Sequence, residues 1–415
     1  MSVFISYHRI MKILHINQSD ISGGAAIAAF RLHQNFLNQN IDSRLLVGQK
    51  TLLFDNNITQ VGFPNRQDRL LRKVTDFIGL NYIYRSDTFK LAQTELLQNS
   101  DVIYLHNLHS GYFNYLALPK IVKDKKTIFV LHDMWSFTGH CAYSYDCNRW
   151  QSGCGKCPYL SEYPSVTRDA TEWEWKLKNW TFNGINMAIV CPSKWLEQCA
   201  KTSLLNRHPI YHIPNGIDTD QFHPLQQDQC RKLLDIFPEQ KVILTLASNL
   251  TVKRKGADIL PRILELLPQS LKREVVILTF GAIDQSLKEL CGFKFHHLGH
   301  LSHNQLKCIA YSASDLFLFP SIADNLPLSV QESLACGTPV VAFDTGGIPG
   351  MVEPGRTGDL IPLQEVDEFA NKVAHLIQNY DSLKAMRQSC HTSAKSKFSS
   401  KVIIQKHIEL INSLS

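Results

Sequence analysis

The segment from Phe319 to Val352 reads FPSIADNLPLSVQESLACGTPVVAFDTGGIPGMV, and its pattern decides the fold class. An apolar strand candidate ends at Phe319, a polar loop follows, and a helical pattern then leads to Gly337. A second short apolar run, Pro339–Phe343, comes directly after that helix. Two buried strands joined by a helix form a parallel β–α–β unit, whose helices cover the faces of the sheet.

The same alternation of short apolar runs and helical patterns extends over the whole chain. In the first half, strand candidates occupy Met11–Asn17, Ser43–Val47, Val102–His106, Thr127–His132 and Met187–Cys191. In the second half they occupy Lys241–Ala247, Val275–Phe280, Leu316–Phe319 and Pro339–Phe343. Strand–helix alternation of this kind predicts an α/β protein with parallel sheets.

A segment rich in Pro, Asn, Gly and Asp, Ile213–Pro224 (IPNGIDTDQFHP), separates the two series of strands. We therefore predict two domains of similar type, at residues 11–213 and 225–398. The stretch Lys401–Leu414 carries apolar residues at helical spacing, so we expect a C-terminal helix over residues 399–415. Packing of this helix against the first domain is one option.

The composition is that of a globular protein and narrows the choice of partners. The 415 residues carry 43 Lys and Arg against 37 Asp and Glu; the net charge of +6 suits phosphates or acidic lipids and does not indicate nucleic acid. Eleven cysteines cannot all pair, which favours a reducing compartment. No apolar run approaches about 20 residues, and the start MSVFISYHRI lacks a signal-peptide pattern. We therefore expect a cytoplasmic protein that starts at Met1 or at Met11.

Two carboxylates in the opening segment are the first candidates for ligand binding. Asp324 lies in the loop after the strand, and Glu332 lies eight residues further on, in the following helix. Both can reach a ligand above that loop, and carboxylates accept hydrogen bonds in pairs from the adjacent hydroxyls of a sugar or ribose. A solvent-facing charge is the ordinary explanation for one such residue. Gly346-Gly347, after the next strand, could offer backbone amides to a phosphate.

A basic motif, TVKRKG at Thr251–Gly256, follows the first strand of the second half. Its cations would lie at the carboxyl end of a parallel strand, where open α/β sheets bind ligands, and could neutralise a diphosphate. A solvated run of charges is the alternative. Gly23-Gly24 would let the backbone approach a phosphate at a helix N-terminus, and a tight turn explains this pair equally well.

With these motifs the chain resembles the retaining glycosyltransferases of family 4. The resemblance covers most of residues 11–415 and rests on the segment PS…D-x7-E…ACGTPVVAFDTGGIP, on the IPNGID linker and on the GG turn. It implies the GT-B fold, an α/β architecture of two Rossmann-like domains whose parallel sheets face each other across a cleft. The family pattern is E-x7-E, and Asp324 stands in its first position, which leaves the donor sugar open.

The resemblance also implies roles for single residues. Glu332 is similar to the carboxylate that holds the donor ribose, Asp324 to the one that meets the transferred sugar, and Lys255 to the lysine that neutralises the leaving diphosphate. The family has an arginine shortly before that lysine; here Arg254 could replace it from the other side. The implied donor-binding set is Gly23, Gly24, Arg254, Lys255, Asp324, Asn325, Leu326 and Glu332. The implied catalytic set is His132, Lys255, Asp324 and Glu332.

Three histidines close predicted strands of the first domain. His132, in FVLHDMW, matches a family histidine that faces the donor sugar, although a lone histidine at a strand end is more often structural. The resemblance implies that the first domain, residues 11–213, binds the acceptor and that the second, residues 225–398, binds the nucleotide sugar. His106 and His109, in YLHNLHSGY, are further candidates on the acceptor side.

The first domain also carries a cysteine-rich insertion at about residues 139–160. Its cysteines, with spacing C-x5-C-x6-C-x2-C, are Cys141, Cys147, Cys154 and Cys157. Four thiolates can form a closed tetrahedral zinc site. A structural zinc ion is one interpretation, and buried free thiols or reversible disulfides are the other. The tryptophans of Glu172–Trp180 could stack on sugars or pack against this insertion.

The activity implied by the resemblance is transfer of a sugar from a UDP- or GDP-sugar to a glycan or lipid-linked glycan with retention, in cell-surface polysaccharide biosynthesis. No cofactor is expected for catalysis, because cations and helix N-termini supply the positive field. Arg66–Leu80 could form a basic amphipathic helix on the inner membrane face, or simply a solvated surface. Two alternatives remain, a nucleotide-sugar epimerase of the same fold and a non-catalytic glycan-binding relative.

Overall fold

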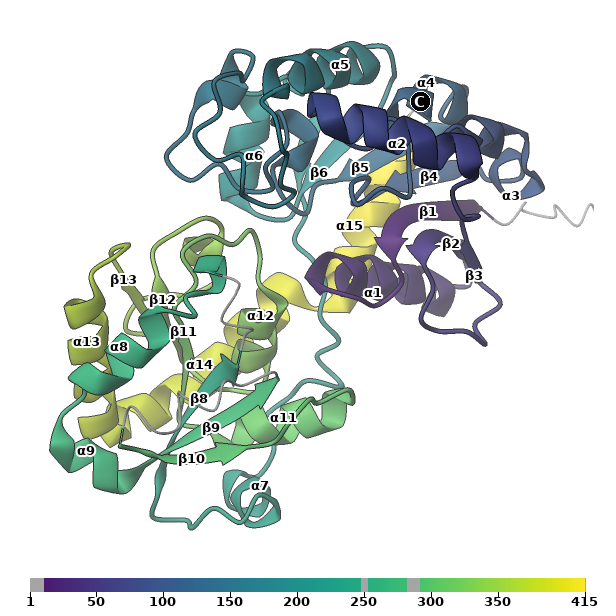
Figure 1. The fold of residues 1–415 in the computed structure, drawn as a ribbon. Coiled ribbons are helices and arrows are strands. Elements are labelled where there is room, and N and C mark those ends of the chain that lie inside the picture. The colour runs from purple at the N-terminus through teal and green to yellow at the C-terminus, as the bar shows by residue number, and fades with distance from the viewer. Residues whose placement is uncertain (1–10, 248–252, 282–291, 415) are drawn as a thin grey trace, which may run out of the picture. The chain divides into compact units, whose positions relative to one another are not determined.

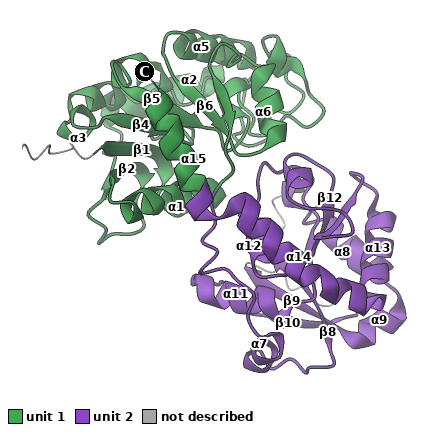
Figure 2. Ribbon diagram, turned by 180° about the vertical axis from the view of Figure 1, so that it is seen from behind, with its two compact units in different colours: residues 1–215, 403–415 green, residues 216–402 purple. Residues whose placement is uncertain are grey.

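The computed structural model describes residues 11–247, 253–281 and 292–414. The chain forms two compact units, shown in different colours in Figure 2. Unit 1 comprises Met1–Asn215 and Ile403–Ser415, and unit 2 comprises Gly216–Val402. Within the described ranges, no helix is both long enough and apolar enough to cross a membrane.

Unit 1 is built on a parallel sheet, which has seven strands in the described part of the chain, in the order β3-β2-β1-β4-β5-β6-β7. Figure 1 labels the strands β1 to β6 of this sheet. The strands are β1 (Lys12–Ser19), β2 (Asp42–Gln49), β3 (Ile58–Gln60), β4 (Val102–Leu105), β5 (Lys126–Val130), β6 (Ala188–Cys191) and β7 (Ile210–His212). Because β1 pairs with both β2 and β4, the strand order reverses between β1 and β4. Open α/β sheets bind ligands beyond the carboxyl ends of the strands at such a reversal.

The helices of unit 1 are α1 (Gly24–Asn38), α2 (Arg66–Ile78), α3 (Glu95–Gln98), α4 (Leu118–Ile121), α5 (Thr171–Asn183), α6 (Lys194–Lys201) and most of α15 (Ser400–Ser413). The apolar side of α15 packs on the sheet. Ile404 and Ile411 share one buried cluster with Phe36 and Tyr104, and the Tyr104 hydroxyl lies 3.1 Å from His407 Nδ1. The end of the chain is therefore part of the core of unit 1.

Unit 2 contains a second parallel sheet, which in the described residues has the order β10-β9-β8-β11-β12-β13. Its strands are β8 (Lys241–Ala247), β9 (Val275–Gly281), β10 (Lys294–His297), β11 (Leu316–Phe319), β12 (Val340–Phe343) and β13 (Gly358–Ile361). All four residues of β11 and of β12 are buried, because helices cover both faces of a parallel sheet. The order reverses between β8 and β11.

The helices of unit 2 form two layers. The described helices are α7 (Gln227–Leu233), α8 (Ile259–Leu266), α9 (Gln269–Glu274), α11 (Asn304–Ala313), α12 (Leu328–Ala335), α13 (Val366–Gln378) and α14 (Tyr380–Phe398). Helix α8 packs against α13, whereas α11 packs against α7 and α12, and α12 packs against α14. The two parallel-sheet α/β units confirm the predicted fold class.

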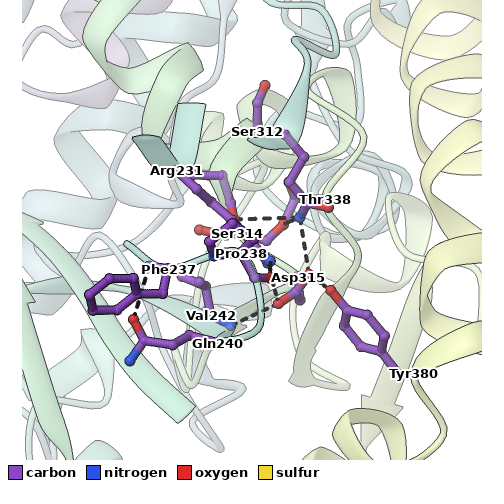
Figure 3. Close-up of polar contacts among 12 residues, drawn as sticks. Arg231, Phe237, Pro238, Gln240, Val242, Ser312, Ser314, Asp315, Thr338 and Tyr380 are labelled. Carbon is purple, nitrogen blue, oxygen red and sulfur yellow. Dashed lines mark hydrogen bonds and ion pairs between the residues drawn. The ribbon is translucent and has the colours of Figure 1, made fainter. Parts of the chain in front are cut away.

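A buried ion pair joins elements of unit 2 at the amino ends of β8 and β11 (Figure 3). Asp315 Oδ2 accepts hydrogen bonds from Arg231 Nη2 at 2.7 Å and from the Val242 amide at 2.7 Å, and Oδ1 accepts one from the Tyr380 hydroxyl at 2.9 Å. Arg231 also donates to the carbonyls of Ala313 and Pro238. Because ligands bind at the opposite end of such a sheet, we assign this network a structural role, in which loss of either partner would leave an uncompensated buried charge.

Candidate functional site

Three loops of unit 2 form a cradle at the carboxyl ends of the adjacent strands β8, β11 and β12. We define the cradle as residues 253–256, 320–327 and 344–348. Backbone hydrogen bonds join the loops: the Ile322 amide donates to the Arg254 carbonyl at 2.9 Å, and the Gly347 amide donates to the Asp324 carbonyl at 3.0 Å. The Thr345 hydroxyl donates to the Ile322 carbonyl at 3.0 Å. Segments some 90 residues apart in sequence thus form one structure.

Two glycines allow the loops of the cradle to approach one another. Gly256 has a φ of +74°, and a Cβ atom there would lie 2.0 Å from the Pro320 carbonyl oxygen. Gly346 has a φ of +56°, and a Cβ atom there would lie 2.0 Å from the Asp324 carbonyl oxygen. Any side chain at either position would push the loops apart, so the geometry of the cradle depends on both glycines.

Asp324 holds two cations inside the cradle. Its Oδ2 atom forms an ion pair with Lys255 Nζ and lies 3.5 Å from Arg254 Nη1, while Oδ1 accepts the Asn325 amide at 3.0 Å. Burial by itself raises the pKa of this carboxyl group, but Lys255 and Arg254 outweigh it and lower the pKa below its usual value. The aspartate is therefore ionised at neutral pH, and it fixes both cations next to the reversal of strand order.

The other predicted residues of unit 2 follow Asp324 in the sequence and are buried. Asn325 and Leu326 follow Asp324 in the loop after β11, and Glu332 lies on α12; each is less than a tenth exposed. The first residues of the basic motif, Thr251 and Val252, lie outside the described residues. The structure thus brings Arg254, Lys255 and Asp324 into direct contact and places Glu332 on the helix that follows.

Gly23 and Gly24 lie where the sequence predicts, between β1 and α1. Gly23 is the N-cap of α1 and has a φ of +95°; the cap makes no side-chain hydrogen bond, and both glycines are exposed. A Cβ atom at either position would meet nothing within 4 Å. The left-handed conformation at Gly23 explains one glycine of the pair, and the open first turn leaves backbone N–H groups available to an anion.

In unit 1, three histidines form a hydrogen-bonded chain: His15 lies within β1, whereas His106 and His132 follow the carboxyl ends of β4 and β5. His15 Nδ1 lies 3.0 Å from His106 Nε2, and His106 Nδ1 lies 3.0 Å from His132 Nε2. The two rings of each pair are close to parallel, with interplanar angles of 21° and 24° and centroids 5.3 Å apart. Burial lowers the pKa of each, for His132 to about 4, so all three are neutral at pH 7.

The buried end of this chain determines the order of its protons. In the described part of the protein, His15 Nε2 is buried and has no hydrogen-bond partner. A buried N–H group without a partner costs more than a bare lone pair, so the proton of His15 lies on Nδ1 and is donated to His106. His106 must then donate from Nδ1, and His132 accepts on Nε2. His132 therefore carries its own proton on Nδ1.

Sequence reasoning missed His15 and Asp133. A polar residue in the middle of the buried run MKILHIN was the available signal for His15, because such a strand position is normally apolar. Asp133 follows His132, and its Oδ2 lies 3.2 Å from Nε2 of the predicted residue His109. The two predicted histidines of the acceptor side thus have different partners: His106 contacts His132, and His109 contacts Asp133.

The four cysteines of the insertion line one small cavity of about 20 Å³, room for about one water molecule. Cys154 Sγ accepts the Gly139 amide at 3.1 Å, and Cys157 Sγ lies 3.4 Å from His140 Nε2. Burial raises the pKa of Cys141 to about 12 and that of Cys154 to about 11. Helix α5 packs against the insertion, since Trp175 Nε1 donates to the Trp150 carbonyl at 2.8 Å.

The thiols share this cavity without converging on one point. Among the described residues, which include all four cysteines, no group of three or more His, Cys, Asp or Glu side chains is arranged to hold a metal ion. The donor chemistry suits zinc, but the present placement does not form a closed tetrahedral site. The structural zinc ion therefore stays a prediction.

Elemental analysis checks this prediction on protein purified without a chelator. If the thiols hold zinc, about one zinc ion per chain should be found, and Cys154→Ser combined with Cys157→Ser should lose it. Cys199→Ser, which changes a half-buried cysteine outside the insertion, should keep the metal. A folded, metal-free wild-type protein whose four insertion thiols titrate normally would exclude the site.

Comparison with known proteins gives two matching family models. Residues 22–221 match the model described as Glycosyltransferase Family 4, and residues 240–379 match the one described as Glycosyl transferases group 1. The chain is 28% identical over 361 residues to WcaC of Escherichia coli K12, whose name describes a colanic acid biosynthesis glycosyl transferase; the match covers 80% of this chain and 83% of WcaC.

Solved structures resemble the chain over nearly its whole length. The Anabaena protein HepE, solved with UDP, superposes with a TM-score of 0.69 at 18% identity, over 97% of this chain and 100% of HepE. WaaG, a glycosyltransferase involved in lipopolysaccharide biosynthesis, superposes with a TM-score of 0.65 at 14% identity, over 97% of this chain and 100% of WaaG. At these identities the likeness concerns the fold.

Proposed function

Because the chain belongs to the family 4, group 1 glycosyltransferases and has their GT-B fold, we propose that it transfers a sugar from a nucleotide diphosphate sugar to a glycan or lipid-linked glycan, with retention at the anomeric carbon. The observation that carries the proposal is the cradle of unit 2, where buried Asp324 holds Lys255 and Arg254 at the carboxyl ends of β8 and β11. Fixed cations there suit the diphosphate of a donor.

The cradle supports a front-face mechanism. The bond between the anomeric carbon and the diphosphate oxygen breaks, and the acceptor hydroxyl oxygen bonds to the same face of that carbon. The hydroxyl proton passes to the departing diphosphate oxygen. Lys255 and Arg254 stabilise the negative charge that develops on the leaving group, and they are already in place before reaction. The protein otherwise orients the two substrates, so the proposal needs no metal ion or other cofactor.

The remaining roles follow the predicted positions. Glu332 would hold the donor ribose, while Asp324, Asn325 and Leu326 would line the sugar subsite. His132 would donate a hydrogen bond from Nδ1 to a sugar hydroxyl, and Gly23-Gly24 would offer backbone N–H groups to the diphosphate. UDP-sugars are the first donors to test, because HepE is solved with UDP-glucose, and GDP-sugars are the second. The name of WcaC supports a role in cell-surface polysaccharide biosynthesis.

A thermal-shift screen with UDP-, GDP- and ADP-sugars, followed by analysis of the transferred product, tests this proposal. One nucleotide class should stabilise the protein, and the anomeric proton coupling of the new linkage should show the donor's configuration. A product of inverted configuration would contradict retention. Binding of a nucleotide sugar without transfer or hydrolysis would favour a non-catalytic relative, and release of an isomerised donor would favour an epimerase.

Helix α2 supports peripheral contact with the cytoplasmic face of the inner membrane. Two buried residues of the helix, Asp68 and Thr75, face the rest of unit 1. Asp68 Oδ1 accepts a hydrogen bond from the Ser86 amide at 3.0 Å. Most other residues of the helix are exposed to solvent. An apolar stripe with exposures from 45 to 67% consists of Leu70, Leu71, Val74, Phe77 and Ile78 on the helix. The cations that flank the stripe are Arg66, Arg69, Arg72 and Lys73.

This combination of an open apolar stripe and flanking cations is typical of helices that lie in the plane of an anionic membrane surface. In vesicle sedimentation, the protein should bind phosphatidylglycerol-containing vesicles more strongly than phosphatidylcholine vesicles. The triple variant Leu70→Ser, Val74→Ser, Phe77→Ser should lower the partition coefficient roughly tenfold or more, because apolar area no longer enters the bilayer. Leu233→Ser, at a 70% exposed leucine of α7, is the control. Equal binding of the triple variant and the control would exclude α2.

A further inference from the structure

Unit 1 contains a cavity of about 550 Å³ at the carboxyl ends of β1, β2 and β4. We call it the tyrosine pocket, after the four tyrosines that line it, Tyr82, Tyr84, Tyr112 and Tyr163. The volume lies within the range of roughly 300–1,000 Å³ that is usual for small-molecule sites. The position, beside the reversal of strand order between β1 and β4, is where α/β sheets bind ligands.

The lining of the tyrosine pocket suits an uncharged, hydroxyl-rich ligand. Besides the tyrosines, the wall contains neutral amides and hydroxyls, among them Gln18, Gln49, Asn81, Ser110 and Thr167. Its charged groups are already paired. Arg85 Nε donates to Asp87 at 2.9 Å and Arg85 Nη2 donates to the Gly62 carbonyl, and Arg72 Nε lies 3.3 Å from Asp76. Aromatic rings pack on the apolar faces of sugars, and amides and hydroxyls pair with their hydroxyl groups.

The walls of the pocket are held in place by the tyrosine hydroxyls. Tyr84 donates to the Gly111 carbonyl at 2.9 Å and Tyr112 donates to the Asn107 carbonyl at 2.7 Å. Tyr82 and Ser110 have φ values of +64° and +78°, conformations that residues other than glycine rarely adopt. Backbone strain of this kind persists where the surrounding structure enforces it, and it concentrates at ligand-binding sites.

One wall of the pocket is connected to the histidines of unit 1. The Tyr163 hydroxyl lies 3.0 Å from Ser110 Oγ and 3.3 Å from His109 Nδ1, and the other ring nitrogen of His109 contacts Asp133. Asp133 is the neighbour of His132 in sequence. A ligand in the tyrosine pocket would therefore lie next to the strand ends that carry the proposed sugar-facing histidine.

We propose that the tyrosine pocket binds the uncharged saccharide end of the acceptor. The acceptor is then a neutral saccharide. The role of the pocket as an acceptor site rests on the proposed transferase function. Its ability to bind a neutral saccharide does not. Helix α2 contributes Arg72 and Asp76 to the wall of the pocket and also carries the apolar stripe. A saccharide attached to a membrane lipid would thus meet the lipid-facing helix and the sugar pocket on the same part of unit 1.

A glycan array that displays neutral and acidic oligosaccharides tests the pocket without knowledge of the native acceptor. The fluorescently labelled full-length protein should be retained on neutral saccharides. Tyr163→Ala should weaken that retention about tenfold, because the ring is lost, whereas Tyr163→Phe keeps the ring and should weaken it less. Tyr163 is 58% exposed, so both variants should fold. Tyr211→Ala, at a 37% exposed tyrosine on β7, is the matched control and should bind like wild type.

The outcomes separate this inference from the proposed function. Retention on acidic glycans alone, or no retention of wild type on any saccharide, would overturn the inference, as would equal binding by Tyr163→Ala and Tyr211→Ala. Wild type, Tyr163→Ala, Tyr163→Phe and Tyr211→Ala are also titrated with UDP and GDP in a thermal-shift assay. If nucleotide stabilisation is intact while glycan binding fails, only the pocket is wrong. If neither nucleotide stabilises wild type, the donor proposal fails, and the array still decides the pocket.

Discussion

Replacement of Lys255 by alanine should lower turnover by about 10- to 1,000-fold and change the affinity for the donor much less. In the cradle, Lys255 Nζ is held against Asp324 Oδ2, so its charge is in place before the leaving group becomes negative. Stabilisers of this kind act mainly on the transition state, in which charge develops on the diphosphate. Arg254, 3.5 Å from the same carboxylate, would retain part of the field.

Steady-state kinetics with the donor found in the nucleotide-sugar screen measures this effect, with turnover and KM determined separately. Lys232→Ala, at an exposed lysine of α7 outside the cradle, is the control and should behave like wild type. Lys255→Arg keeps the charge and should recover part of the activity. The assignment of Lys255 fails if Lys255→Ala turns over at the wild-type rate. A melting curve for each variant separates lost chemistry from lost folding, because Lys255→Ala leaves Asp324 with one cation fewer.

The second large effect concerns the two carboxylates. Glu332→Gln should weaken binding of the free nucleoside diphosphate and of the nucleotide sugar alike, by about 1–3 kcal/mol, because the proposed ribose contact is common to both ligands. Asp324→Asn should leave the affinity for the nucleoside diphosphate undiminished and depress sugar transfer. The structure gives a reason: Asp324 ties Lys255 and Arg254 together, and its loss leaves both cations available to a diphosphate but no longer fixes them for the sugar.

Asp324→Glu completes this series. It restores the longer side chain of the E-x7-E pattern and moves the carboxylate by about the length of one C–C bond. We expect the preference among donor sugars to change while the nucleotide stays the same. The preference is measured by comparing kcat/KM for each donor. An unchanged ranking of sugars in Asp324→Glu would show that position 324 does not select the sugar.

Much of the fold could be predicted from the sequence, because strands buried on both faces leave continuous apolar runs. Short apolar runs such as LFLF at β11 and VVAF at β12, separated by a helical pattern, are typical of buried parallel strands. The strands β3, β7, β10 and β13 were missed. All four lie at the edges of their sheets and are partly exposed, so their sequences ITQ, IYH, KFHH and GDLI mix polar and apolar residues.

The loops that carry the candidate site residues could be predicted from the sequence, but the contacts between these loops could not. A parallel sheet places the carboxyl ends of adjacent strands together, so polar residues after strands were sound candidates. The contact between Asp324 Oδ2 and Lys255 could not be predicted, because it depends on the backbone geometry of segments that are distant in sequence. The same holds for the close approach of the loops that Gly346 allows. The tyrosine pocket gathers short segments from five regions of unit 1, none with a recognisable motif.

Isothermal titration calorimetry with UDP, and with GDP if UDP does not bind, tests the central claim that the cradle of unit 2 is the donor site. The account predicts binding of one equivalent to wild type, an affinity lowered by about 1–3 kcal/mol in Glu332→Gln, and no loss of affinity in Asp324→Asn. If wild type binds neither nucleotide, or if the two variants weaken binding equally, the division of roles within the cradle is contradicted.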